Sequence, residues 1–413
     1  MPDAHTRGTD TGGMSVLPPP AMLPITCLRR VRPWGGDPVD IEMDAGVITA
    51  ITPAGDRPIG AREFDGRGLL ALPGIVNAHA HVDKSWWGLP WQSYGGEGTT
   101  EGRIRHERAE REALGIPSLE RSAHVLRELV RHGTTAIRTH VDVDARLGLR
   151  GIEAVEEAAA AYEGALDVRI VAFPQDGILR RPGVLELLRD AATRPSVDAV
   201  GGLDPATIDR DPVGQIDAVT ALAADTGVGV DIHLHDPADL GAFQIELLVD
   251  RAARLGLHGR VNIAHGFAVA QLEPARRRDL LAAMAEVGVT MTTVAPLRLP
   301  QLPLAELDAA GVRFAFGTDG IRDLWSPYGT GDTLGIAWQY ARAAGLVRDE
   351  DLSRVARLAT SAGAWAVGRD VHDLVEGARA DIVLVDAENP MDALVRLPER
   401  ALVVGGGRVL HVA

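Results

Sequence analysis

Two histidines separated by one residue follow an apolar stretch early in the chain. Residues 69–76 read Leu-Leu-Ala-Leu-Pro-Gly-Ile-Val, and His79 and His81 come shortly after them. A near-continuous apolar run predicts a buried strand, and alternate residues of a strand project from the same face. Two imidazoles on one face supply half of a metal site of the catalytic zinc type. A single pair of this kind is more often structural, so the prediction depends on partners elsewhere.

Other polar side chains follow later apolar segments in the same way. They are His140, Asp142, Gln175, Asp204, His233, His235, His265 and Asp319. If the apolar segments are parallel strands of a barrel, their carboxyl ends meet at one mouth, where such folds place their chemistry. Ordinary packing would scatter histidines among helices and both ends of the strands. The distribution therefore predicts that these side chains converge.

Lys84 is the only lysine among the 42 basic residues, so the other 41 are arginines. Arginine presents a wide planar fork, whereas lysine presents a compact charge whose pKa shifts on burial. This lysine comes three residues after His81. We therefore expect Lys84 to have a role in the site that arginine cannot take.

A unit of a long helix, a glycine and a short apolar strand repeats through the middle of the chain. Glycine, which commonly ends a helix, occurs at Gly133, Gly227, Gly288 and Gly311. Strands are expected at 75–79, 136–141, 168–173, 199–203, 228–233, 261–265, 289–294 and 313–317. Helices between successive strands imply parallel pairing, and eight such units predict an α/β fold of the (β/α)8 TIM-barrel type. An open doubly wound sheet is the alternative, but no Gly-x-Gly-x-x-Gly motif supports it.

Both ends of the chain differ from the middle in their pattern of apolar and polar residues. Alternating apolar and polar runs occupy residues 39–43 and 47–51, with a hairpin turn at 44–46, and similar runs recur near the C-terminus. We therefore expect residues 23–68 and 370–413 to form one small β-sandwich domain and residues 69–369 to form the barrel. Residues 1–22 are rich in glycine, threonine and proline, which predicts a disordered tail.

The composition limits the partners of the chain. The formal net charge is -15, which argues against nucleic acid or an anionic membrane as a partner. Cys27 is the only cysteine, so neither an intramolecular disulfide nor a thiolate metal cluster is expected. No apolar run approaches the roughly 20 residues that span a bilayer. These features favour a cytoplasmic location, and they leave homo-oligomerisation open.

The polar residues at the strand ends predict one metal ion and one catalytic water. His79 and His81 are the leading ligands, and His233 is the natural third because its strand ends as the first one does. Asp319 supplies a carboxylate that can bind the metal and accept the proton of the water. His265 is positioned to polarise the substrate or to stabilise its developing charge.

An ordered set of motifs extends this interpretation. The motifs are Arg138-Thr-His-Val-Asp142, Val171-Ala-Phe-Pro-Gln-Asp-Gly177, Gly201-Gly-Leu-Asp-Pro-Ala-Thr207, His233-Leu-His-Asp236, Phe316-Gly-Thr-Asp319 and Ile321-Arg-Asp-Leu-Trp325. From about Leu69 to the C-terminus the chain resembles the amidohydrolase superfamily, its cytosine deaminase branch and, within that branch, the N-isopropylammelide isopropylaminohydrolases. The resemblance implies a single zinc or iron ion, with the ligands His79, His81, His233 and Asp319.

The resemblance also implies which side chains act on the substrate. The residues assigned to catalysis are Asp319, His265, Lys84 and Asp236. The residues assigned to substrate binding are Gln175, Trp325, His235, His140 and Trp86. Two interpretations stay open for His140, Asp142 and His235, which either orient the metal ligands or line the substrate pocket. Trp86 is equally compatible with ordinary packing of a barrel loop, and Asp204 with a loop cap.

Two positions depart from the cytosine deaminases. Those enzymes have a glutamate three residues after the third histidine, where this chain has Asp236, as the isopropylaminohydrolases do. They also have a second aspartate after the metal-binding one, where this chain has Gly320. Cytosine itself is therefore disfavoured as the substrate. Binuclear amidohydrolases need a bridging lysine on a middle strand, and the only lysine here is Lys84, so a mononuclear site is expected.

The predicted activity is hydrolysis of an exocyclic C–N bond in a small pyrimidine- or triazine-like molecule. A metal hydroxide attacks the ring carbon, Asp319 transfers the proton, and the amine leaves as ammonia or an alkylamine. The alternatives are hydrolysis of a cyclic or linear amide at the same site, and a catalytically silent metal-binding protein. A catalytically silent protein would be expected to lack one or more of the metal ligands, whereas the sequence contains all of the expected ones.

Overall fold

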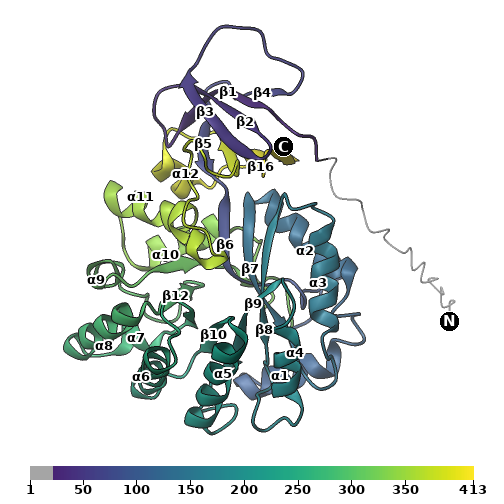
Figure 1. Cartoon of the computed structure of the whole chain (residues 1–413), viewed down its shortest axis with the longest axis vertical. Helices are drawn as coiled ribbons and strands as arrows, with labels where there is room; N and C mark the ends of the chain where they lie inside the picture. The colour runs from purple at the N-terminus through teal and green to yellow at the C-terminus, as the bar shows by residue number, and fades with distance from the viewer. Residues whose placement is uncertain (1–21) are drawn as a thin grey trace, which may run out of the picture.

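The computed structural model describes residues 22–413, which form a large parallel barrel and a smaller mixed sheet (Figure 1). The tail expected at 1–22 therefore lies outside the described residues, apart from Met22. In Figure 1 the small sheet lies at the upper end of the molecule, and the barrel with its helices fills the rest.

The barrel strands lie where the sequence predicts them, so the alternative of an open doubly wound sheet is wrong. They are β6 (Ile75–His81), β7 (Thr134–Asp142), β8 (Asp167–Phe173), β9 (Val197–Leu203), β10 (Gly229–Leu234), β11 (Val261–His265), β12 (Thr290–Thr293) and β13 (Phe314–Phe316). Each strand pairs in parallel with the next one in the chain. Their residues are almost all buried, as expected for strands that are covered on both faces.

A strand of two residues closes the barrel. β14 (Asp319–Gly320) follows β13 and pairs in parallel with β6, the first barrel strand. The Asn77 amide holds this junction, because its Nδ2 donates to Thr318 Oγ1 (2.8 Å) and its Oδ1 accepts from the Thr318 N–H (3.1 Å). A Cβ on Gly317 would collide with the backbone of His79, so only glycine permits this close approach. The closure brings His79 and Asp319 together.

Helices connect the strands, and most of them cover the outside of the barrel (Figure 1). They are α1 (Thr100–Glu110), α2 (Leu119–Arg131), α3 (Arg150–Ala160), α4 (Val184–Ala191), α5 (Pro212–Thr226), α6 (Ala238–Arg254), α7 (Ala268–Gln271), α8 (Pro274–Val287), α9 (Leu304–Ala310), α10 (Thr333–Ala343), α11 (Asp349–Leu358), the 3₁₀ helix η1 (Ser361–Val367) and α12 (Pro390–Arg396). Gly227, Gly288 and Gly311 follow α5, α8 and α9 with left-handed backbone, as predicted. Within residues 22–413 every helix is too short or too polar to cross a bilayer.

Strands from both ends of the described chain form the second sheet. They are β1 (Cys27–Pro33), β2 (Val39–Asp44), β3 (Val47–Pro53), β4 (Glu63–Asp65), β5 (Leu70–Pro73), β15 (Ile382–Val385), β16 (Arg400–Gly405) and β17 (Arg408–Val412). The order β17-β16-β15-β5-β1-β2-β3, with β4 against β1, places N- and C-terminal strands side by side. Ala45 and Gly46, with φ of 47° and 82°, form the predicted hairpin turn between β2 and β3. Leu28, Ile41 and Leu384 belong to a hydrophobic core of this sheet.

A buried histidine joins the segment before the C-terminal strands to the start of the barrel. His372 Nε2 lies 2.7 Å from the Gly74 carbonyl oxygen, and His372 Nδ1 lies 3.1 Å from the Arg369 guanidinium. These partners match a neutral ring that donates from Nε2 and accepts at Nδ1. Burial, only partly offset by Asp381, lowers the pKa of His372, so the folded state disfavours protonation.

We therefore expect His372 to make the fold sensitive to mild acid. Because its folded-state pKa is depressed, its stabilising contribution is complete above the unfolded-state value of about 6.5 and decreases as the pH falls below that value. The free energy of unfolding of the wild type should fall more steeply below about pH 6.5 than that of His372→Gln, by up to about 1.4 kcal/mol per pH unit. Urea unfolding at several pH values measures both slopes. Equal slopes would assign the acid sensitivity to other groups.

Candidate metal centre and active site

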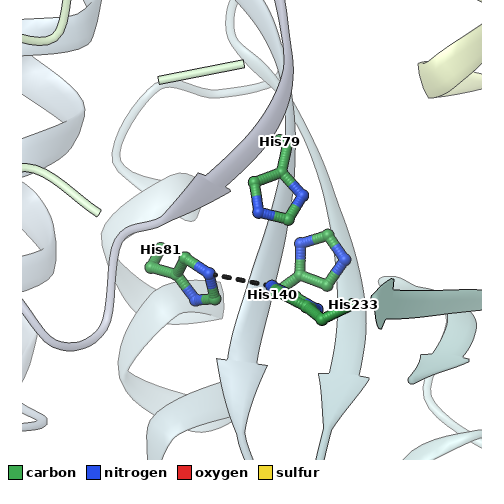
Figure 2. Close-up of side chains that lie close together, drawn as sticks. All are labelled: His79, His81, His140 and His233. Carbon is green, nitrogen blue, oxygen red and sulfur yellow. Dashed lines mark hydrogen bonds between the residues drawn. The ribbon is translucent and has the colours of Figure 1, made fainter. Parts of the chain in front are cut away.

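Four histidine rings converge inside the mouth of the barrel (Figure 2). His79 and His81 come from β6, His140 comes from β7 and His233 comes from β10. One ring nitrogen from each of the four lies within 4.8 Å of the others. The Nε2 atoms of His81 and His233 are 3.2 Å apart, which is the dashed line in Figure 2. Strand alternation explains part of the convergence, because His79 and His81 lie two positions apart on one strand.

Asp319 joins this group from the strand that closes the barrel. Its Oδ1 lies 3.3 Å from His81 Nε2 and 3.6 Å from His79 Nε2. Donor atoms bound about 2.0–2.2 Å from one tetrahedral ion are about 3.3–3.6 Å apart, so the spacing of these atoms fits a single ion. Asp319 also has left-handed backbone (φ 60°), a strained conformation for a non-glycine residue and one that clusters at functional sites.

The ring nitrogens and the carboxylate are in the forms that bind a metal. Within the described residues, both ring nitrogens of His79 and one each of His81 and His233 are buried without a hydrogen-bond partner. Burial holds the pKa of His81 and of His233 well below the ordinary value, so both rings are neutral. Burial alone would raise the pKa of Asp319, but the neighbouring rings of His79 and His81 hold it well below its usual range. Neutral imidazoles and an ionised carboxylate fit a divalent metal ion.

His265 and His235 lie beside this cluster, at the ends of β11 and β10. Their rings stack with centroids 4.4 Å apart. Burial lowers the pKa of His265 well below its usual value, so this ring is neutral. Burial acts in the same way on His235, but Asp204, whose Oδ2 lies 3.0 Å from His235 Nδ1, outweighs it and raises the pKa. The mouth therefore holds a neutral imidazole next to one that is readily protonated.

Lys84 lies in a buried cluster of acids just after β6. Its Nζ donates to Asp142 Oδ1 (2.7 Å) and to Gln175 Oε1 (2.8 Å), and Glu107 Oε1 lies 3.7 Å away. Burial alone would lower the pKa of Lys84, but the charges of Asp142, Glu107 and Asp83 raise it above the ordinary value. Burial also raises the pKa of Asp142, to about 7. The lysine head fills a compact gap between oxygen atoms, which suits an ammonium group better than a planar guanidinium.

A cavity of about 310 Å³ opens next to the convergent histidines. Its walls include His81, His233, His265 and Asp319, and also the predicted substrate residues Lys84, Gln175, His235 and Trp325. The Phe173 ring, which stacks on His233 with centroids 4.1 Å apart, forms another part of the wall. A cavity of this size, with aromatic walls and a few polar groups, suits a small heterocycle.

Two residues predicted to bind substrate lie beside the cavity and not among the residues that line it. His140 is buried, and its Nε2 lies 3.3 Å from Asp231 Oδ1. Trp86 is also buried and donates from Nε1 to the Asp323 carbonyl oxygen (3.0 Å). His140 therefore contacts Asp231, and Trp86 binds the backbone at Asp323. Contact of either side chain with substrate stays a prediction.

Asp236, which the sequence assigns to catalysis, also lies outside the set of residues that line the cavity. Its Oδ1 accepts from Thr207 Oγ1 (2.5 Å) and its Oδ2 accepts from Gln244 Nε2 (3.0 Å). The two bonds tie its carboxylate to the loop after β9 and to α6. Its catalytic role stays a prediction.

Asp323 is a cavity residue that the sequence did not single out. Its Oδ1 accepts from the N–H groups of Trp325 and Ser326 (both 2.8 Å), and burial is the main cause that raises its pKa to about 6. A Cβ on Gly320 would collide with Asp323 Oδ2. The Asp323 carboxylate therefore occupies the space that a side chain at position 320 would take. No local sequence pattern reveals this arrangement.

Two more acids support the site from behind the cavity wall. Glu107 of α1 faces Lys84, and Asp231 of β10 lies between His140 and Arg138, whose Nε is 2.9 Å from Asp231 Oδ2. Asp231 precedes His233 by two residues, so strand alternation was a usable signal for its inward direction. Glu107 belongs to a polar helix, where no such signal exists.

Comparisons with known sequences point to one family of enzymes. Residues 62–411 match the model of the Amidohydrolase family. The chain is 30% identical over 363 residues to the N-isopropylammelide isopropyl amidohydrolase of Pseudomonas sp. (strain ADP). The alignment covers 84% of this chain and 87% of that protein.

Solved structures share both the architecture and part of the sequence. The N-isopropylammelide isopropylaminohydrolase of Burkholderia multivorans ATCC 17616 superimposes with a TM-score of 0.88 at 39% identity, over 94% of this chain and 98% of that one. The 5-methylcytosine deaminase of Klebsiella pneumoniae, liganded with 5-fluorocytosine, superimposes with a TM-score of 0.79 at 25% identity, also over 94% and 98%.

Proposed function

Because the chain belongs to the amidohydrolase family, as its motifs predicted, we propose that it hydrolyses the exocyclic C–N bond of a small nitrogen heterocycle. The proposed substrate is a pyrimidine- or triazine-like ring, since similar proteins are named for N-isopropylammelide and 5-methylcytosine. The group that leaves is ammonia or an alkylamine.

The observation that carries this proposal is the meeting of four donor residues beside a cavity of the right size. His79 and His81 come from the first barrel strand, His233 comes from the fifth, and Asp319 comes from the strand that closes the barrel. We assign these side chains as the ligands of one zinc or iron ion, because three imidazoles and one carboxylate suit either metal.

Proton transfer in the proposed reaction falls to Asp319. His79, His81, His233 and Asp319 would hold a divalent ion, which would supply Lewis-acid chemistry and lower the pKa of a bound water towards about 7. The second carboxylate oxygen of Asp319, Oδ2, would accept a proton from the attacking water. It then delivers that proton to the exocyclic nitrogen, because a protonated amine leaves more easily than an amide anion.

Three further groups are assigned to the charge that develops during attack. His265 donates a hydrogen bond towards the reacting centre. His235, which Asp204 orients and keeps readily protonated, supplies a second donor beside it. Asp323, with a pKa of about 6, is suited to exchange a proton with a ring nitrogen near neutral pH.

Ring recognition is assigned to Lys84, Gln175 and Trp325. The Lys84 ammonium has three protons, and its bonds to Asp142 and Gln175 use two of them, which leaves one for a ring oxygen or nitrogen. Gln175 fixes the direction of this ammonium and also lines the cavity. Trp325 supplies an aromatic wall on which a flat heterocycle can stack.

An assay for released ammonia and alkylamines tests the proposal directly. Protein loaded with zinc or iron is incubated with a panel of aminopyrimidines and of amino- and alkylaminotriazines. We expect at least one substrate to release its amine with the ring intact, and we expect chelation of the metal to stop the release. Ring-opened products would favour amide hydrolysis at the same site. Bound metal without turnover of any ring would favour a silent protein, and either result would contradict the proposal.

A further inference from the structure

An arginine that has no carboxylate partner within the described part of the chain lines the substrate cavity. Arg103 of α1 lines the cavity next to Trp325, whose ring centroid lies 5.9 Å from the guanidinium carbon. The Arg103 Nε is buried without a hydrogen-bond partner, and within residues 22–413 no carboxylate oxygen lies within 4.0 Å of the guanidinium nitrogens. A cation–π contact alone is worth less than the charge-assisted bonds that a guanidinium normally makes.

The other cations in the cavity wall are paired inside the protein. Lys84 pairs with Asp142 at 2.7 Å, and His235 pairs with Asp204 at 3.0 Å. Their charges are therefore largely balanced before any ligand enters. Arg103 is different, because its charge is available to the molecule that occupies the cavity.

The start of α1 adds positive potential at the same place. Figure 1 shows α1 at the end of the barrel that lies away from the small sheet. Thr100, the first residue of this helix, also lines the cavity, and the N-terminus of a helix favours anions. An acidic residue in the first turn usually offsets this potential. Glu101 belongs to the first turn of α1, but it also lies 3.8 Å from Arg180 and 3.7 Å from Arg210, which share its charge and do not line the cavity.

We propose that the cavity selects a heterocycle that carries a full negative charge, and that Arg103 binds this charge. The charge is that of a ring carboxylate or of an ionised ring hydroxyl, both of which a guanidinium binds through charge-assisted hydrogen bonds. The inference rests on the proposed function, because it specifies the class of ring on which that reaction occurs. Arg103 is thereby a specificity-determining residue, distinct from the groups that act on the C–N bond.

Binding of three ring compounds tests the inference without any turnover. Orotate carries a ring carboxylate, barbiturate carries an ionised ring hydroxyl, and uracil is neutral; all three lack an exocyclic amine. Calorimetric titration of the metal-loaded protein gives their dissociation constants. We expect at least one anion to bind about 10- to 100-fold more tightly than uracil, and the preferred anion identifies the source of the charge.

The Arg103 side chain should account for that preference. R103Q should lose it and still bind uracil as the wild type does, which shows that its cavity is intact, and R103K should keep part of it. R105Q is the matched control, because Arg105 belongs to the same helix but is exposed and paired with Glu97 (2.6 Å); it should keep the full preference. A preference that survives in R103Q, or no preference in the wild type, would overturn the inference.

The titration tests the role of Arg103 and the amine-release assay tests the proposed function, so a negative result in one does not decide the other. An Arg103-dependent preference for anions, with no amine released from any ring, would uphold this inference and contradict the proposed function. Amine release from neutral rings, with no preference between orotate, barbiturate and uracil, would do the opposite.

Discussion

His233→Ala is expected to abolish both metal binding and catalysis. The change removes the donor that lies 3.2 Å from His81 Nε2 and leaves three of the four proposed ligands. We expect the purified variant to have lost most of its metal by elemental analysis. Its rate of amine release should fall on the order of 10³-fold or more, because enzymes of this kind accelerate their reactions by at least about 10⁶-fold.

His258→Ala is the matched control for this experiment. His258 lies in the connection between α6 and β11 and is exposed, so its loss should change neither metal content nor rate. Full metal retention in His233→Ala would contradict the assignment and point to His140, which offers a ring nitrogen within 4.8 Å of those of His79 and His81. If His140 only orients the ligands, His140→Ala should weaken metal binding by about 10- to 100-fold without abolishing it.

Lys84→Met is expected to cost more stability than any substitution on the surface. Methionine keeps the length of the side chain but leaves Asp142, Glu107 and Asp83 facing one another without a cation. Removing one partner of a buried ion pair typically costs about 3–5 kcal/mol, and urea unfolding should show a loss of this size. Adding Asp142→Asn should restore part of it, because the neutral amide does not need the cation. A loss below about 1 kcal/mol, as for an exposed pair, would mean that Lys84 does not hold these acids together.

Lys84→Arg separates the role of the charge from the role of the shape. The guanidinium keeps the charge, so the free energy of unfolding should stay closer to that of the wild type. Its wider head displaces Asp142 and Gln175, and a displacement of about 1 Å near the reacting groups can lower kcat by about 100-fold. Arg105→Lys, the reverse exchange at an exposed position of α1, should leave both quantities unchanged. Wild-type rates in Lys84→Arg would show that the lone lysine is accidental.

The barrel could be predicted because its strands and helices have different hydrophobic periods. Residues 261–265 were expected as a strand and form β11 with the same bounds, and the other predicted barrel strands overlap the observed ones. β14 could not be predicted in this way, because it has two residues and no period. It forms because Asn77 bonds to Thr318, 241 positions away, and because Gly317 lets the backbones approach. Such contacts depend on the closed barrel and not on local sequence.

Some residues of the site could likewise be predicted from local sequence, and others are placed only by contacts in the folded chain. The convergence of His79, His81 and His233 was predictable, because they end or follow buried strands whose carboxyl ends meet in a barrel. Arg103 and Glu107 reach the cavity and the lysine cluster from α1, a polar helix in the connection after β6, and nothing in its sequence indicates which side faces inward. Asp323 occupies the space beside Gly320, a placement that only the folded loop reveals.

The closing strand has a consequence for how the protein holds together. Proposed metal ligands stand on both sides of the seam where the cylinder shuts, on β6 and on β14. A bound ion would cross-link β6 and β14, which are far apart in the chain. Cross-links that close long loops restrict the unfolded polypeptide most. Loss of the ion would then loosen the whole cylinder and not a single loop. Metal supply and the lifetime of the fold would thereby be coupled.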